Sequence, residues 1–395
     1  MAAEAGINVS DEYEPLMRRL DDIAPLLDES AERSEELGRL TDVIVEALRH
    51  TGVFRVCIPR ELGGYEFAPH QIIDTVARLA HADSAASWSV MALQMVTGTT
   101  AAYVGAEAAR DLFPDVRNGD HALIAGQGTK PGAAVKVDGG YRITGRWHFA
   151  SGLPIASHVH TAVLCEQTGA ALVCTLPKEQ VEQIDDWDVM GLRATSSIDY
   201  RCADVFVPDS HVYEAATTDN PHGGALYRVG LVNMSSLFHT GWALGVGRRM
   251  LDEMKALAAE KSGRPRASVD TGQFYAEYAE AESKLRSARA WSREVWADNE
   301  AALRRGELLT AEQETLTRLA LNNATWSAQA VGQTVYKWAA TAALRRGALQ
   351  RFFRDLHAGT QHVTSGPVVL QNCGKSLSGL APDSTWVFLD LREGA

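Results

Sequence analysis

The sequence lacks the signatures of several protein classes. Its five cysteines are scattered and no two form a CxxC pair, so neither a zinc ribbon nor a disulfide framework is indicated, and we expect buried, reduced thiols. The formal net charge of -12 argues against nucleic acid or an anionic membrane as the main partner. No run of about 18 apolar residues occurs, so we expect no membrane span. The opening residues, MAAEAGINVSDEYEPL, do not resemble a signal peptide, and we expect a cytoplasmic protein.

Nucleotide-binding and metal-binding signatures are also missing. No GxGxxG follows a predicted strand and no GxxxxGK[ST] occurs, so the chain has neither a Rossmann fingerprint nor a P-loop. A nucleotide cofactor would therefore be held by other means. His357 and His362 have no accompanying set of acidic or cysteine ligands, so we predict no metal site.

Three regions follow one another along the chain. Apolar residues spaced three and four apart predict helices in the first region, and Gly139 and Gly140 in VDGGY predict a hairpin among short β-rich runs in the second. Long helical patterns with little Gly or Pro predict a bundle in the third. We therefore expect a mainly α protein with a small central antiparallel β domain, divided into an N-terminal helical domain (1–120), a β domain (121–220) and a C-terminal four-helix bundle (221–395).

Four motifs occur in the order found in a known fold. PRELGGYEF, GYRITGRWHFASG, DVMGLRATSSIDYRCADVFVP and LQRFFRDLHAGTQH together resemble the acyl-CoA dehydrogenase fold, over about residues 15 to 390. That family implies two chemistries. One branch dehydrogenates acyl-CoA with a glutamate base, and the other consists of two-component monooxygenases that receive reduced flavin from a separate reductase.

The residues at the two base positions of the dehydrogenases favour the monooxygenase branch. By this resemblance, the dehydrogenase loop Tyr-Glu-Gly-Thr, whose Glu is the base, corresponds to His357-Ala358-Gly359-Thr360 in this chain. Ala358 stands at the position of the Glu and cannot take a proton. The alternative base position falls near Ser235. Neither is a carboxylate.

RFFRDLHAGTQH is similar to the monooxygenase segment that ends in a catalytic histidine, which implies that His362 is the base. An imidazole titrates near neutral pH and can take a phenolic or similar proton. His357 stands five residues earlier, off the face expected for an i, i+4 pair, and is the weaker candidate. Packing against backbone is the alternative interpretation for both.

WHFASG is similar to the monooxygenase run whose serine bonds near flavin N5, which implies that role for Ser151. Phe149 and Ala150 precede it and are predicted flavin contacts. Alternation along a strand predicts that Trp147, Phe149 and Ser151 share one face. A plain β-edge turn is the alternative.

Other flavin contacts follow from the resemblance. LIAGQGTK implies Gln127 and Thr129, MGLRATSS implies Arg193 and Ser196, and EKSGRPRAS offers Arg264 and Arg266 for a phosphate. For Arg193 and Ser196 the alternative is a packing role, and for Arg264 and Arg266 it is a solvated basic loop. Dehydrogenases have a glycine-rich run where this chain has residues 339–342, Ala-Ala-Thr-Ala, and the added Cβ atoms slightly favour FMN over FAD.

The segments that line the pocket in this fold carry aromatic and apolar side chains. They include Trp88, Met91, His239 and Trp242, and with His357 they predict a cavity suited to a ring system; a core position is the alternative for each.

The resemblance thus implies a monooxygenase that forms a C4a-hydroperoxyflavin from FMNH2 or FADH2 and O2 and hydroxylates an aromatic or polycyclic small molecule. We expect a homotetramer, because Ala- and Trp-bearing faces of the long C-terminal helices suggest an interface between subunits. We also expect a separate NAD(P)H-dependent flavin reductase, because the chain shows no nicotinamide site. The alternatives are a dehydrogenase or oxidase of the acyl-CoA dehydrogenase type and a flavin-free binding or scaffold subunit.

Overall fold

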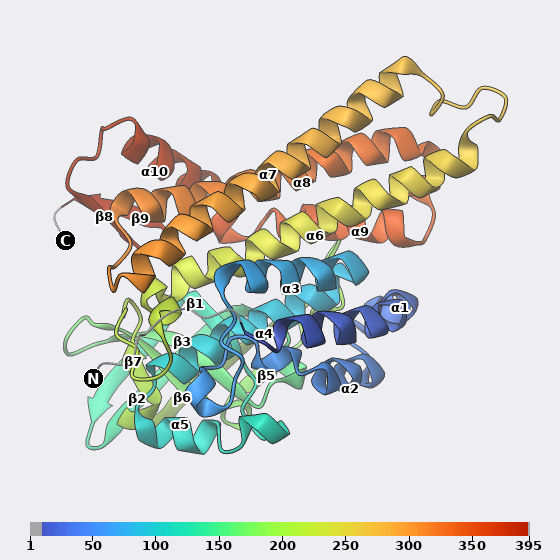
Figure 1. Cartoon of the computed structure of the whole chain (residues 1–395). Helices are drawn as coiled ribbons and strands as arrows, with labels where there is room; N and C mark the ends of the chain where they lie inside the picture. Colours follow the sequence, from blue (N-terminus) through green and yellow to red (C-terminus); the bar gives the residue numbers. More distant parts are fainter. Residues whose placement is uncertain (1–9, 394–395) are drawn as a thin grey trace.

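The chain folds as helices, then strands, then helices again (Figure 1). The computed structural model describes residues 10–393. The expected mainly α fold with a central β region is confirmed. The predicted domain boundaries lie between elements: α5 ends at Leu112 and β1 begins at Ile124, while β7 ends at Glu214 and α6 begins at Gly230.

The N-terminal region contains one long buried helix, α4, which packs against α3, α6 and β1. Asp83 caps it by accepting a hydrogen bond of 2.6 Å from the N–H of Ala86, and nearly every residue of α4 is buried. A helix that is apolar all round belongs in a core. The helices of this region are α1 (Tyr13–Leu37), α2 (Asp42–Thr51), α3 (Pro69–Ala82), α4 (Ser84–Tyr103) and α5 (Ala106–Leu112).

The β region is one seven-stranded sheet in the order β5-β6-β2-β1-β3-β4-β7. The predicted hairpin joins β1 to β2, and Gly139 adopts a φ of 73° there. The expectation of a purely antiparallel sheet is wrong, because β1 pairs with β3 in parallel. The hairpin signal fixes only the β1–β2 pair; after β2 the chain crosses to the other side of β1. The strands are β1 (Ile124–Val137), β2 (Gly140–Ala150), β3 (His158–Cys165), β4 (Ala171–Pro177), β5 (Glu182–Ile184), β6 (Ile198–Pro208) and β7 (Val212–Glu214).

The end of β2 departs from simple alternation. The pairing of β2 with β6 shifts register between Trp147 and Ala150, and Phe149 adopts a φ of 65°. Trp147 is fully buried and donates its indole N–H to the carbonyl of Ala162 at 2.9 Å, whereas 64% of Phe149 is exposed. The prediction that Trp147 shares a face with Phe149 and Ser151 is wrong, because this irregularity turns Phe149 away from the buried side.

The C-terminal region is built on three long helices that lie side by side across the top of Figure 1, above α3 and α4. Among the described residues it also holds two shorter helices and a hairpin, so it is more than the four helices expected. Its elements are α6 (Gly230–Lys261), α7 (Gly272–Arg304), α8 (Ala311–Ala339), α9 (Ala348–Gly359), α10 (Pro367–Leu377), β8 (Ser384–Val387) and β9 (Asp390–Glu393). Within residues 10–393, no helix is both long and apolar enough to cross a membrane. All five cysteines are buried.

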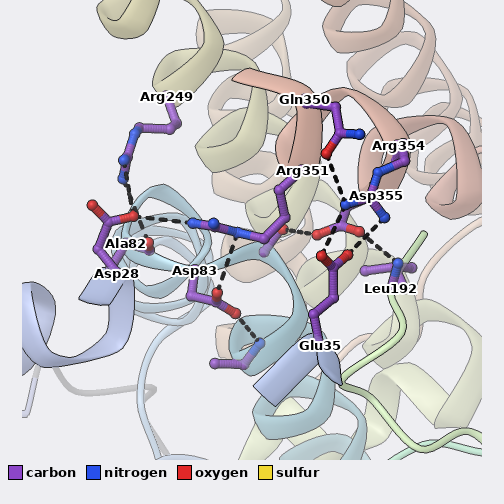
Figure 2. Close-up of polar contacts among 12 residues, drawn as sticks. Asp28, Glu35, Ala82, Asp83, Leu192, Arg249, Gln350, Arg351, Arg354 and Asp355 are labelled. Carbon is purple, nitrogen blue, oxygen red and sulfur yellow. Dashed lines mark hydrogen bonds and ion pairs between the residues drawn. The ribbon is translucent and has the colours of Figure 1, made fainter. Parts of the chain in front are cut away.

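Charged side chains of α9 join that helix to the N-terminal helices. Figure 2 shows Arg351 beside Asp28 and Asp83. Arg354 donates from both of its terminal nitrogens to the carboxylate of Glu35 (Figure 2). Arg351 is buried and shares Asp28 with Arg249. A buried charge needs a partner of opposite sign, and Arg351 has two in Asp28 and Asp83.

Asp355, also on α9, holds the loop of residues 187–192. Its carboxylate is 1% exposed and accepts hydrogen bonds from the hydroxyl of Ser84 and, at 2.6 Å, from the N–H of Leu192 (Figure 2). Arg354 donates to the carbonyl of Met190 at 2.8 Å. The backbone of Gly191 lies against α9 so closely that a Cβ there would stand 2.2 Å from the carbonyl oxygen of Arg354. The loop and α9 therefore hold each other in place.

We expect Gly359→Ala to destabilise the protein. A Cβ on Gly359 would lie 2.2 Å from the indole of Trp242, and overpacking of this kind costs about 1–3 kcal/mol. Gly374→Ala on α10 is the matched control, because a Cβ there meets nothing within 4 Å. The control should be neutral or more stable by about 0.5–1 kcal/mol. Urea unfolding of both variants measures the difference, and equal free energies of unfolding would contradict the close contact.

We expect Asp355 to make stability depend on pH. Burial raises the pKa of its carboxyl to about 6 from an ordinary value of 3.8, so the folded protein binds this proton more tightly than the unfolded chain. The group's contribution is therefore most favourable below about pH 4 and declines as pH rises through about 6, by about 3 kcal/mol. Asp355→Asn keeps an acceptor without the charge, so its stability relative to wild type should rise by that amount between pH 4 and pH 7. If urea unfolding showed the same change of unfolding free energy with pH for wild type and Asp355→Asn, the raised pKa of Asp355 would be contradicted.

Candidate functional site

A cavity of about 710 Å³ lies where all three regions meet. It is walled by α4, β1, the end of β2, the loop 187–192, α6, the segment 357–364 and the turn between β8 and β9. Apolar side chains predominate. Among the described residues that line it, none is an aspartate, glutamate, lysine or arginine, and the titratable ones are His160, His239, His357 and His362.

Ser151 stands in this cavity at the end of a chain of hydroxyls. Its Oγ accepts a hydrogen bond of 3.1 Å from the indole N–H of Trp88 and lies 2.6 Å from the Oγ of Ser197. Ser197 lies 2.6 Å from the hydroxyl of Thr195, which donates to the carbonyl of Leu192 at 2.8 Å. We call these groups, from Trp88 to Leu192, the hydroxyl relay.

The carbonyl at one end fixes the direction of the hydroxyl relay. A carbonyl oxygen only accepts, so the proton of Thr195 points to Leu192, that of Ser197 to Thr195, and that of Ser151 to Ser197. Ser151 thus donates its proton to Ser197 and uses one lone pair to accept the indole N–H of Trp88. Its other lone pair is left for the cavity, so Ser151 offers a bound ligand an acceptor.

Three aromatic rings from separate segments form a second cluster. The imidazoles of His239 (α6) and His362 stack with centroids 3.9 Å apart, and the ring of Trp88 (α4) meets each edge-on. Nδ1 of His362 lies 2.7 Å from the hydroxyl of Thr364, and Nδ1 of His239 lies 2.9 Å from the carbonyl of Ser235.

Both stacked histidines are neutral at physiological pH. Burial lowers the pKa of His239 to about 4. Burial, together with repulsion from His239, places the pKa of His362 well below its ordinary value. Two cations this close in an apolar pocket are excluded by desolvation and by their like charge.

His357 also lines the cavity, from α9, but neither of its ring nitrogens is free. Nδ1 lies 2.7 Å from the carbonyl of Phe353, and Nε2 lies 2.8 Å from the amide nitrogen of Gln333. It therefore shapes the wall.

The cavity brings together most of the residues singled out from the sequence, namely Trp88, Met91, Gln127, Thr129, Phe149, Ser151, His239, His357 and His362, with Ser235 and Ala358 at the two base positions of the dehydrogenases. Six other residues lie outside its lining, among them Ser196 and Arg266. Ala150 is buried, and Trp242 is buried with its indole N–H on the carbonyl of Ser84 at 2.9 Å. Arg193 borders a neighbouring charged hollow, and Arg264 pairs with Glu260 in an exposed segment. Their flavin or substrate roles remain predictions.

Several site residues carried no sequence signal. Thr364 contacts the ring of His362, and Ser197 contacts the hydroxyl of Ser151. A single Thr or Ser outside a motif gives no signal in the sequence that would identify it as a site residue. Phe388 and Leu389, in the β8–β9 turn, close part of the cavity. Only the folded chain brings this turn to α6. Within the described residues, no three or more His, Cys, Asp or Glu side chains are placed to hold a metal ion.

The cavity fits a flavin ring. A planar aromatic ligand with an N–H finds the open face of Phe149, 64% exposed although it lines the cavity, and the spare lone pair of Ser151. Gln127 uses its carbonyl oxygen to accept the backbone N–H of Thr129 at 2.8 Å, which leaves its amide N–H₂ as a donor. These groups would hold the ring.

Comparisons with known proteins give one family model and several relatives. Residues 237–366 match the family model described as "Acyl-CoA dehydrogenase, C-terminal domain". The oxygenase subunit HsaA, a flavin-dependent monooxygenase of Rhodococcus jostii, is 30% identical over 373 residues, covering 89% of this chain and 94% of that protein. Indole-3-acetate monooxygenase of Pseudomonas putida is 27% identical over 350 residues, covering 86% and 87%.

Solved structures share the whole architecture. The crystal structure of 3-HSA hydroxylase from Rhodococcus sp. RHA1 superposes with a TM-score of 0.86 at 27% identity, covering 92% of this chain and 97% of that one. Two more distant structures of the same fold, at 20% and 19% identity, contain FADH2 (XiaF) and FMN (KijD3). Because a relative at 30% identity is matched over 94% of its length and a solved hydroxylase shares the whole fold, the chain belongs to the family of flavin-dependent monooxygenases, as an oxygenase component.

Proposed function

We propose that this oxygenase hydroxylates an uncharged aromatic or polycyclic compound, using FMNH2 delivered by a separate NAD(P)H-dependent flavin reductase. The observation that carries the proposal is a single cavity that holds Ser151, with its spare lone pair, together with two neutral histidines.

The lack of charge in the cavity supports an uncharged substrate. No described lining residue is a lysine or arginine, so a carboxylate on the substrate would have no counter-ion inside. Burying an unpaired charge is costly. The named substrate of the indole-3-acetate relative carries such a carboxylate, and we propose that the substrate of this chain does not.

Each part of the cavity has a role in this proposal. Bound reduced flavin supplies the electrons that allow one atom of O2 to enter the substrate while the other becomes water. With its spare lone pair, Ser151 would accept a hydrogen bond from flavin N5–H and hold that proton in place. The apolar wall around Phe149, Met91 and Phe238 excludes water from the reacting atoms.

FMN is the flavin in our proposal because of residues 339–342. Their Cβ atoms occupy the stretch that is bare glycine where the dehydrogenases hold a dinucleotide tail.

The alternatives find less support. A dehydrogenase needs a carboxylate base, and among the described residues of the cavity wall there is none. A flavin-free scaffold would not require the directed hydroxyl relay or the stacked imidazoles.

A homotetramer is part of the proposal. Large apolar side chains are exposed on and near α8 and α10, which supports burial between subunits. They are Trp326, Val363, Val368, Leu370, Leu377 and Leu380.

The proposed activity is tested with reduced flavin. Anaerobic protein loaded with FMNH2, and separately with FADH2, is mixed with O2 and either indole or indole-3-acetate, and hydroxylated product is counted per flavin oxidised. We expect product with FMNH2 and a preference for indole over its acetate of at least about 100-fold in kcat/KM, because the buried carboxylate lacks a partner. No hydroxylation of any uncharged aromatic compound in a panel would refute the function, and equal use of the acid would refute the uncharged substrate.

Ser151→Ala should uncouple flavin oxidation from hydroxylation. The variant removes the acceptor for N5–H, so product per flavin should fall by about 10-fold while hydrogen peroxide rises to match. Ser197→Ala keeps the Ser151 oxygen but removes the acceptor of its proton, so a smaller loss is expected. Product and peroxide are measured after a single turnover; unchanged coupling in Ser151→Ala would contradict the role.

A further inference from the structure

The two stacked imidazoles differ in which nitrogen carries the proton. His239 lies on α6 and His362 follows α9, and both line the cavity. Each ring turns Nδ1 toward its own segment. No described residue bonds to Nε2 of either ring, so Nε2 is the nitrogen available to a ligand.

His239 carries its proton on Nδ1. That nitrogen lies 3.2 Å from the hydroxyl of Ser235, which can donate or accept, and 2.9 Å from the carbonyl oxygen of the same residue, which can only accept; the closer carbonyl makes Nδ1 the donor. In a neutral imidazole the other nitrogen then has a free lone pair. Nε2 of His239 is therefore a proton acceptor.

His362 has the opposite arrangement. The backbone N–H of Thr364 points at its Nδ1 and donates to it at 3.5 Å, and the Thr364 hydroxyl, which can donate or accept, lies 2.7 Å from the same nitrogen. An amide N–H cannot accept, so Nδ1 of His362 holds the lone pair. Nε2 of His362 therefore carries the proton and is a donor.

We propose that His239 is the catalytic base of the hydroxylation and that His362, assigned that role from the sequence, is instead the hydrogen-bond donor that holds the resulting anion. The inference rests on the proposed function and adds to it that the substrate bears a ring O–H or N–H. That bond breaks, its proton forms an N–H bond with Nε2 of His239, and its electron pair stays on the substrate. His239 gains one positive charge and the substrate one negative charge, and electron density on the ring rises before oxygen transfer.

The surroundings favour this division of work. The new imidazolium keeps its Nδ1 bond to Ser235, and the anion beside it balances its charge in an otherwise uncharged pocket. The stacked His362, 3.9 Å away, stays neutral because a second cation would repel the first. Its Nε2–H is consequently fixed as a donor throughout the step.

The tautomers are tested first, without flavin or substrate. Protein labelled with ¹⁵N-histidine is examined by long-range ¹H–¹⁵N NMR at neutral pH, with His239→Asn and His362→Asn used to assign the two rings. We expect His239 to show a protonated Nδ1 and a bare Nε2, and His362 the reverse. A protonated Nε2 on His239, or a bare Nε2 on His362, would overturn the proposal.

The roles are tested next with phenols of different acidity, in single turnover with bound FMNH2. His239→Asn should hydroxylate phenol about 100-fold more slowly, the effect of losing a general base. The loss should shrink to less than about 10-fold with a fluorinated phenol whose O–H is more acidic but still protonated at the assay pH, because its proton leaves more easily without a base. His362→Asn should lose activity equally with both phenols, because its donor acts on the anion. The exposed His50→Asn on α2 is the control.

The outcomes separate this inference from the proposed function. If wild type hydroxylates a panel of uncharged aromatic compounds but His239→Asn loses the same factor with both phenols, the base assignment fails while the function stands. If wild type hydroxylates none of the panel, the function fails and the proton step with it. His239→Gln gives a second variant should His239→Asn not fold, as judged by gel filtration and circular dichroism.

Discussion

The backbone of Leu192 ties together the two chemical halves of the site. Its N–H is held by the buried carboxylate of Asp355 at 2.6 Å, and its carbonyl receives the hydroxyl of Thr195 at 2.8 Å. Asp355 belongs to the helix that leads to His362, and Thr195 begins the relay that orients Ser151. The backbone of one residue thus sets the position of the loop against α9 and the direction of each proton up to Ser151. The charged contacts of Arg351 and Arg354 hold α9 itself against the N-terminal helices (Figure 2).

A second constraint is that the cavity handles protons without fixed charges. Ionised side chains would be expensive in an apolar pocket unless paired there, and the described lining has none. The groups left to exchange protons in the cavity are hydroxyls and neutral imidazoles. Each of these can donate or accept a hydrogen bond, so its role depends on the direction of the bonds it already makes. A carbonyl end orients the Ser151 relay, and the carbonyl of Ser235 and the backbone N–H of Thr364 orient the two rings. Backbone groups, which cannot change protonation, therefore define which side chain donates and which accepts.

Much of this architecture was predictable from local patterns. The helix–sheet–helix order, the VDGGY hairpin and a cavity containing Ser151, Phe149 and His362 follow from motifs that lie within short stretches of chain. The errors occurred where a local rule meets a distant partner. Strand alternation predicted one face for Trp147 and Phe149, but the pairing of β2 with β6 breaks there. The sheet became mixed because β3 crosses to the far side of β1.

The sequence by itself determined which side chains are available: serine and histidine at the site, and alanine and serine where a dehydrogenase has its base. Only the tertiary structure decided what those side chains do. The lone pair that Ser151 offers depends on Trp88, Ser197 and Thr195, and the donor and acceptor roles of His362 and His239 depend on the backbone geometry around each ring. A hydrogen bond has a direction, and that direction is set by partners that meet only when the chain is folded.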